Sequence, residues 1–109
     1  MEKITAVQTL AALAQDARLD IFRLLVRGGV DGMAAGDIGR AIGLPAATLS
    51  FHLKELKNAG VVHCRRNGRS LIYSPDFGVM NDLLSYLTEN CCQGMTDCKS
   101  PRKKRGIKR

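Results

Sequence analysis

The chain has 109 residues, a length typical of one small domain, and 45% of them are hydrophobic, which allows a single core. A chain this short has little room for a DNA contact surface and a deep catalytic pocket together, which weighs against an enzyme. Its net charge is +7, which favours a negatively charged partner. Because neither a run of about 18 apolar residues nor a secretory signal pattern is found, we expect no membrane span and a cytoplasmic location. Four cysteines in that reducing compartment are then expected to be thiols or ligands rather than a disulfide framework.

Two helices are predicted at the start of the chain. Apolar residues recur there at helical spacing and predict a first amphipathic helix with a stripe made of Ile4, Val7, Leu10, Ala11 and Ala14. Asp16 is the expected N-cap of a second, mostly apolar helix over residues 17–27, which Gly28 and Gly29 end. A loop is expected over residues 30–34.

Two further helices joined by a tight turn are predicted next. The third helix is expected over residues 35–42 and is stopped by Gly43. The fourth is expected over residues 45–59, with Pro45 at its first position and an apolar face formed by Leu49, Leu53 and Leu56. Two helices connected in this way are typical of a helix-turn-helix.

Beyond residue 60 the pattern changes from helical to extended. Two extended runs, 61–66 and 69–73, flank Asn67 and Gly68, and Asn-Gly in that position is the strongest short signal for a β-hairpin with a primed turn. A fifth helix is predicted over residues 76–90, with an apolar stripe of Phe77, Met80, Leu83, Leu84 and Leu87. The predicted fold is therefore mainly α, of the α+β kind: a winged helix-turn-helix with five helices and a two-stranded β-wing.

Basic residues are concentrated in two places. Residues 99–109 hold seven basic residues and no acidic one, and we expect them to form a disordered tail. Residues 54–69 hold five basic residues against Glu55 alone, which favours a DNA-binding surface over ordinary solvated charges on a helical bundle. The expected DNA contacts are Ala46, Ala47, Ser50, Phe51, His52, Lys54 and Lys57 on the fourth helix and Arg65, Arg66, Asn67 and Arg69 on the wing.

Several stretches of residues 10–87 resemble one family, the ArsR/SmtB metal-sensing repressors. Residues 13–25, LAQDARLDIFRLL, are similar to the second helix of that family, residues 36–45, GDIGRAIGLP, to its helix-turn-helix, and residues 65–69, RRNGR, to its wing. The resemblance implies a homodimer built through the first and last helices, which represses a palindromic double-stranded operator until an inducer binds. Ala17 stands where proline is common in the family, which concerns only how the second helix starts.

Three cysteines follow the last predicted helix. Cys91, Cys92 and Cys98 fall within eight residues, and Gly94 lets the chain turn so that Cys98 can fold back. Trivalent arsenic or antimony prefers three thiolates, whereas zinc usually takes four ligands. Residues 91–98 therefore predict an inducer site for arsenite or antimonite, next to a DNA-binding and dimerisation domain over residues 1–90, and they resemble the arrangement in a subset of the family's arsenic sensors. Cys64, in the wing strand, is interpreted as a small buried hydrophobe.

Other functions stay open at this point. The three thiols also suit cadmium, lead, zinc or copper(I), or the sensing of oxidants. Residues 33–37 lack the Cys-x-Cys pair of many arsenical repressors, and the last helix has carboxylates but no His, so the family's zinc site is not expected. A thiol enzyme such as an arsenate reductase is disfavoured, because Cys91 and Cys92 follow a helix C-terminus, where the dipole disfavours a thiolate. A protein-binding winged helix is the remaining rival.

Overall fold

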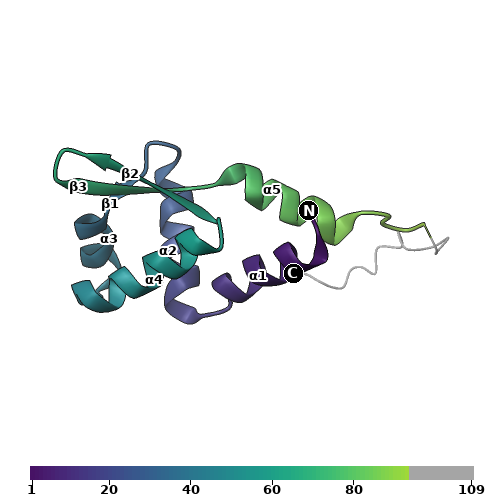
Figure 1. Cartoon of the computed structure of the whole chain (residues 1–109), viewed down its shortest axis with the longest axis horizontal. Helices are drawn as coiled ribbons and strands as arrows, with labels where there is room; N and C mark the ends of the chain where they lie inside the picture. Colours follow the sequence, from purple (N-terminus) through teal and green to yellow (C-terminus); the bar gives the residue numbers. More distant parts are fainter. Residues whose placement is uncertain (94–109) are drawn as a thin grey trace.

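A computed structural model describes residues 1–93 of the protein (Figure 1). The five predicted helices are confirmed, and the elements in chain order are α1 (Lys3–Leu13), α2 (Asp16–Gly28), β1 (Met33–Ala34), α3 (Ala35–Ile42), α4 (Ala46–Asn58), β2 (Val62–Asn67), β3 (Ser70–Pro75) and α5 (Phe77–Thr88). Within these residues, no helix has the length and apolar character that a bilayer crossing needs. The order of elements is that of a winged helix-turn-helix.

The starts of α2, α4 and α5 each differ by one residue from the prediction, and Asp76 is the N-cap of α5 rather than its first residue. The N-cap of α2 is Gln15, whose side-chain oxygen accepts the backbone N–H of Arg18 at 3.1 Å. The prediction of Asp16 as the cap is wrong: it lies inside the first turn, where a carboxylate interacts favourably with the helix dipole. Pro45 is the N-cap of α4, and the helix itself begins at Ala46.

The sheet has three strands in the order β1-β3-β2, rather than the two strands expected. Met33 of β1 pairs with Tyr73 of β3. The prediction of a loop over residues 30–34 is therefore wrong for Met33 and Ala34, which form a short strand. A strand of two residues is too short to leave a periodic signal in the sequence. Its backbone pairs with the edge of β3 that the hairpin leaves open.

The β-hairpin is confirmed, with its turn one residue later than predicted. Asn67 pairs with Ser70, so the two residues of the turn are Gly68 and Arg69 rather than Asn67 and Gly68. Gly68, the first residue of the turn, has φ 64°. A type II′ hairpin turn needs positive φ at that position and therefore favours glycine there. The turn therefore places Arg69 at the tip of the wing.

The core lies between α2, α3, α4 and the sheet. Leu53 and Leu56 of α4 are fully buried and Leu49 is nearly so, which confirms the predicted inner face of this helix. They pack with side chains from the other elements, including Ile21, Phe22, Leu25, Ile38, Val61, Val62 and Tyr73. This core holds α3, α4 and the wing in fixed relative positions.

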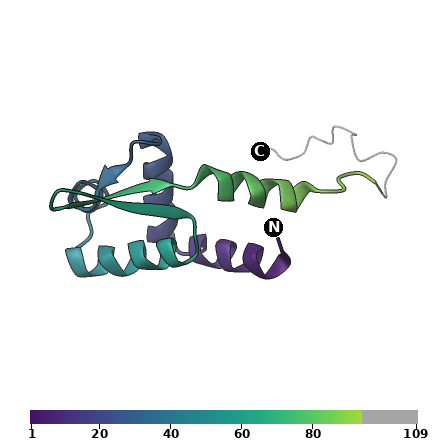
Figure 2. The same cartoon turned by 45° about the horizontal axis from the view of Figure 1, so that its top comes forward.

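Helices α1 and α5 contact each other and extend away from this core, as the two views in Figures 1 and 2 show. The apolar stripe predicted on α1 is not the side that the helix buries within a single chain. Ile4, Val7 and Leu10 are 64%, 57% and 43% exposed, and the residues that α1 buries are Ala6, Thr9 and Ala12. The small buried residues allow α1 to lie close to its neighbours, and the large ones face outwards.

The predicted stripe of α5 is buried only in part. Leu83 is buried, while Leu84 and Leu87 are 55% and 54% exposed. Of the other two members, Met80 packs against the core and Phe77 is partly exposed. In a single chain α5 has few neighbours along its length, so only a narrow strip of its surface is covered.

Candidate nucleic-acid interface

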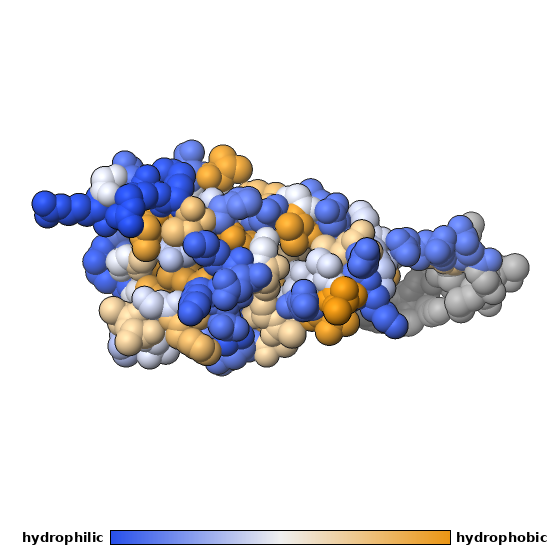
Figure 3. Space-filling view, viewed as in Figure 1, coloured by the Kyte–Doolittle hydropathy of each residue, from blue (hydrophilic) through white to orange (hydrophobic). Residues whose placement is uncertain are grey.

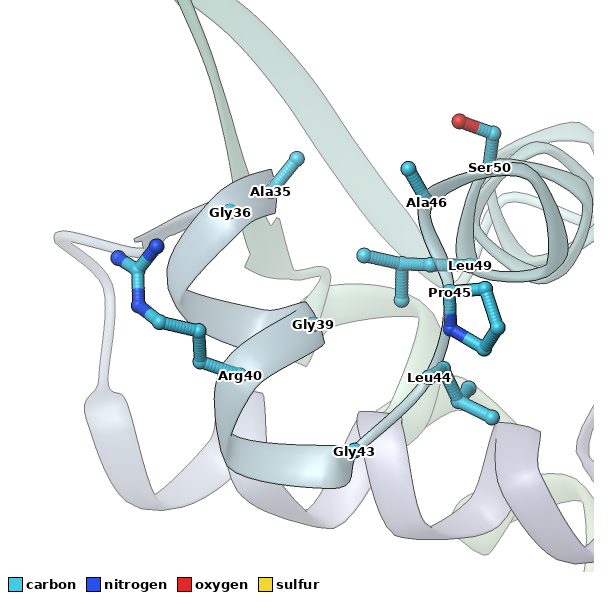
Figure 4. Close-up of a pocket in the computed structure, with 10 residues that line it drawn as sticks. All are labelled: Ala35, Gly36, Gly39, Arg40, Gly43, Leu44, Pro45, Ala46, Leu49 and Ser50. Carbon is cyan, nitrogen blue, oxygen red and sulfur yellow. The ribbon is translucent and has the colours of Figure 1, made fainter.

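The turn between α3 and α4 brings the two helices very close together. Gly43 has φ 82° in the left-handed region and ends α3. At Gly39, a Cβ atom would lie 3.2 Å from Cδ2 of Leu49, so a side chain there would push the helices apart. Figure 4 shows the hollow between the two helices, lined mostly by small residues together with Arg40, Leu44 and Leu49, with the side chains of Ala46 and Ser50 pointing to the same side.

One face of α4 is free of protein contacts that would keep DNA away. Ala46, Ala47, Ser50, Phe51 and Lys54 are all exposed, as is Lys57 in the last turn. The first turn carries only short side chains and its backbone N–H groups have no side-chain cap. The helix can enter the major groove N-terminus first, because the side chains of its first turn are too short to hold the backbone away from the bases.

His52 is the exception among the residues predicted on this helix. It is only 7% exposed, and its Nδ1 accepts a hydrogen bond from Nε of Arg18 in α2 at 3.1 Å. The prediction of His52 as a DNA contact is therefore wrong. The spacing of Leu49, His52, Leu53 and Leu56 is i, i+3, i+4, i+7, the pattern of one helix face, and could have identified His52 as buried. Nothing local in the sequence marks Arg18 as its partner.

The wing carries the second group of predicted contacts. Arg65, Arg66, Asn67 and Arg69 are all exposed on the hairpin, and Figure 3 shows hydrophilic side chains over the part of the wing that projects from the molecule. The guanidinium of Arg65 donates a hydrogen bond to the backbone carbonyl of Asp31 at 2.8 Å, which ties β2 to the loop before β1. Within residues 1–93, Arg66 and Arg69 form no ion pair, so both charges are available for phosphate.

The cysteine segment begins directly after α5. The Sγ atoms of Cys91 and Cys92 are 3.2 Å apart and both residues are exposed. Cys91 is a free thiol, but Cys92 is disulfide-bonded, so the expectation that the cysteines are thiols or ligands is wrong for Cys92 in this structure. Asn90 and Cys92 have φ 60° and 70°, so the chain turns sharply there. Cys98 and the basic residues 99–109 lie outside the described residues. Up to residue 93, no three His, Cys, Asp or Glu side chains come together to form a metal site.

Cys64 lies apart from this segment. It is half-buried in β2, directly opposite Tyr73 in β3, and packs against the core. The interpretation of Cys64 as a small buried hydrophobe is confirmed only in part, because the residue packs against the core but is half-buried. Burial, followed by the hydrogen bond and the charge of Cys64, raises the pKa of Tyr73 above its ordinary value.

Known proteins resemble this chain in sequence and in fold. A helix-turn-helix domain family matches residues 13–65. The transcriptional repressor SdpR of Bacillus subtilis (strain 168) is 31% identical over 86 residues, which is 79% of this chain and 92% of SdpR. A homodimeric winged helix-turn-helix DNA-binding domain from Mycobacterium bovis, described as a possible ArsR-family transcriptional regulator, is 27% identical with a TM-score of 0.65 over 80% of this chain and 85% of that one.

The chain belongs to the ArsR family of winged helix-turn-helix transcriptional regulators. A further solved structure, HlyU from Vibrio cholerae N16961, is 28% identical with a TM-score of 0.65, covering 85% of this chain and all of that one. In this ArsR-family protein, α3 and α4 are the helix-turn-helix and the hairpin is the wing. Its relatives are regulators of transcription, which agrees with the expectation that the chain is not an enzyme. The arsenic-responsive subset and the cysteine site stay predictions.

Proposed function

We propose that the protein is a homodimeric repressor of transcription that leaves its operator when trivalent arsenic or antimony binds Cys91, Cys92 and Cys98. One observation carries the DNA-binding half of this proposal. The free face of α4 and the arginines of the wing lie at the same end of the molecule, remote from the end of α5 (Figure 1). One duplex can therefore contact both elements at once.

The contacts divide by chemistry. The short side chains at the start of α4 bring Ser50 to the base edges of the major groove, where a hydroxyl can donate or accept a hydrogen bond. Lys54 and Lys57 suit phosphates next to that groove. The wing adds Arg66 and Arg69, so that backbone charge is neutralised on two sides of the recognition helix.

The exposed apolar residues of α1 and α5 support a dimer. Val7 and Leu10 lie on α1 and Leu84 and Leu87 on α5, and these two helices are neighbours. A second copy that uses the same two helices would bury them in a symmetric interface. Two copies would present two recognition helices, which matches a palindromic operator with half-sites about one helical turn apart.

The inducer half of the proposal rests on the two sulfur atoms at the end of α5. Cys92 is disulfide-bonded in this structure, so the proposed site requires reduction of that disulfide. Once reduced, the adjacent sulfurs of Cys91 and Cys92 can bind one soft ion together, and Cys98 supplies a third sulfur six residues later in the sequence. In the reduced protein, three thiolates suit a trivalent metalloid. Release of the operator by a factor of 100 needs a coupling free energy of only about 2.7 kcal/mol between the two sites.

Fluorescence anisotropy with DNA from the protein's own promoter region tests both halves together. The reduced protein is titrated at fixed salt, with and without arsenite, and with zinc for comparison. We expect selective binding that arsenite abolishes and zinc leaves intact. Cys91→Ser, Cys92→Ser and Cys98→Ser should each bind DNA normally and lose the release, while the control Cys64→Ser keeps it.

The outcomes separate the alternatives. Selective binding that ignores arsenite but responds to cadmium, lead, copper(I) or an oxidant would keep the repressor and replace the inducer. Normal release in all three cysteine variants would refute the proposed site. An absence of selective DNA binding would leave the winged helix as a protein-interaction module.

A further inference from the structure

One large apolar side chain stands on the otherwise polar and small-residue face of α4. Leu49, Leu53 and Leu56 point into the core, but Phe51 is 54% exposed. It follows Ser50 directly and lies one turn after Ala47, both of which are short and exposed. The ring therefore protrudes from the surface that the proposed function places in the major groove.

The ring of Phe51 is held in position by a contact from another helix. The guanidinium carbon of Arg18 in α2 lies 5.5 Å from the ring centroid, within the range of a cation–π interaction. The ring of His52 lies 5.6 Å from the same centroid at an interplanar angle of 60°. Arg18 also donates its Nε–H to Nδ1 of His52 at 3.1 Å, so its guanidinium is itself fixed.

The Phe51 ring loses little conformational entropy when DNA binds, because it is already ordered in the free protein. A free phenylalanine on a surface would lose side-chain freedom on binding, but here Arg18 and His52 already restrict it. An aromatic ring cannot form a conventional hydrogen bond with the carbonyl oxygens and amino groups of the groove, and N–H···π contacts are weak. The one apolar group that bases present in the major groove is the C5 methyl of thymine.

We infer that Phe51 reads thymine methyl groups in the operator, and that Arg18 is the positioning residue that aims it. This inference rests on the proposed function, and it adds the base that the recognition helix selects. It also gives Arg18 a role in DNA recognition although its guanidinium is engaged within the protein.

The test begins with the DNA sequence that the full-length protein selects from a randomised duplex library. Each thymine of that sequence is then replaced by deoxyuridine, which removes the methyl and leaves base pairing unchanged. We expect one thymine position in each half-site to be sensitive. Loss of one buried methyl weakens binding about fourfold, and loss of both in the dimer about 15-fold.

Variants assign the effect to its residues. Phe51→Ala should bind the thymine and deoxyuridine operators with equal affinity. Arg18→Ala should lower the ratio of the affinity for the thymine operator to the affinity for the deoxyuridine operator. Arg18→Lys keeps the charge but loses the Nε–H donor to His52, so its ratio should fall between those of Arg18→Ala and the natural protein. Lys54→Ala is the matched control on the same helix, and it should weaken binding to both operators by the same factor.

The possible failures are distinguishable. No enriched DNA sequence would refute the proposed function itself. An enriched sequence in which no thymine is sensitive to loss of its methyl would leave the repressor intact and refute the reading by Phe51. A Phe51→Ala variant that still distinguishes the two operators would refute it equally. An Arg18→Ala variant with an unchanged ratio would remove the role given to Arg18.

Discussion

His63 in β2 contacts Asp76 at the start of α5, with 3.0 Å between Nε2 of His63 and Oδ2 of Asp76. The other carboxylate oxygen of Asp76 caps α5 by accepting the backbone N–H of Val79 at 2.9 Å. One carboxylate therefore joins the wing to the helix that leads to the cysteines. The two contacts contribute unequally to the stability of the fold. The His63 side chain is 64% exposed, and an exposed ion pair adds little to the free energy of unfolding.

Replacement of Asp76 should show the cap to be the stronger contact. Asp76→Ala should lower the free energy of unfolding by about 1 kcal/mol, the usual cost of losing an N-cap. Asp76→Asn should retain most of that stability because asparagine caps helices as well. His63→Ala should change it by less than about 0.5 kcal/mol. Urea denaturation at one protein concentration measures all three, and equal losses for the two Asp76 variants would show that the His63 contact dominates.

Charge placed on the exposed faces of α1 and α5 should dissociate the dimer. Val7→Glu and Leu84→Glu each put two carboxylates into a symmetric interface and remove two buried apolar side chains. We expect the dimer Kd to rise by about 100-fold or more. Sedimentation velocity over a range of concentrations measures this. Val30→Glu is the control, since Val30 is 76% exposed in the turn before β1, and a similar loss in that variant would argue against the proposed interface.

The wing arginines should contribute affinity without sequence preference. Arg66→Ala or Arg69→Ala removes two phosphate contacts from a dimer, so the slope of log K against log salt should become shallower by about 2. Operator and unrelated DNA should be affected alike. Arg65→Ala should in addition lower thermal stability, because it loses the hydrogen bond to Asp31. A wing variant that weakens only operator binding would mean that the arginine contacts bases.

Tyr73 should make the fold sensitive to alkali. Burial and the neighbouring Cys64 raise the pKa of Tyr73, so the folded state disfavours the tyrosinate. The stabilisation is complete below the unfolded pKa of about 10 and is lost as the pH rises through the higher folded value. Tyr73→Phe should abolish this loss. Absorbance titration in a Tyr86→Phe background isolates Tyr73, and Cys64→Ala should bring its pKa closer to the ordinary value.

Local patterns in the sequence were enough to predict most of the fold. Helix periodicity, the glycines after α2 and α3 and the Asn-Gly pair predicted five helices and a hairpin, because each of these signals acts within a few residues. The three core leucines of α4 followed from the same periodicity. His52 belongs to that pattern too, and its polar side chain led to its misassignment to the DNA surface.

Other features depend on contacts that no local pattern records. The stripe of Ile4, Val7 and Leu10 has the spacing of a core face, but periodicity does not distinguish burial within a chain from burial against a partner. The contact between Arg18 and His52 joins residues 34 positions apart. Spacing alone predicted the thiol site, and the described residues hold only its first two sulfurs, so the site stays a prediction.

The narrow buried strip of α1 ties the amount of protein to its stability. The helix buries only Ala6, Thr9 and Ala12, so a single copy gains little free energy from keeping it in place. If association covers the rest of α1, the melting temperature must rise with the logarithm of protein concentration, by mass action. A cell that makes few copies would then hold a looser, protease-sensitive repressor, and dilution alone would weaken repression before any inducer arrives.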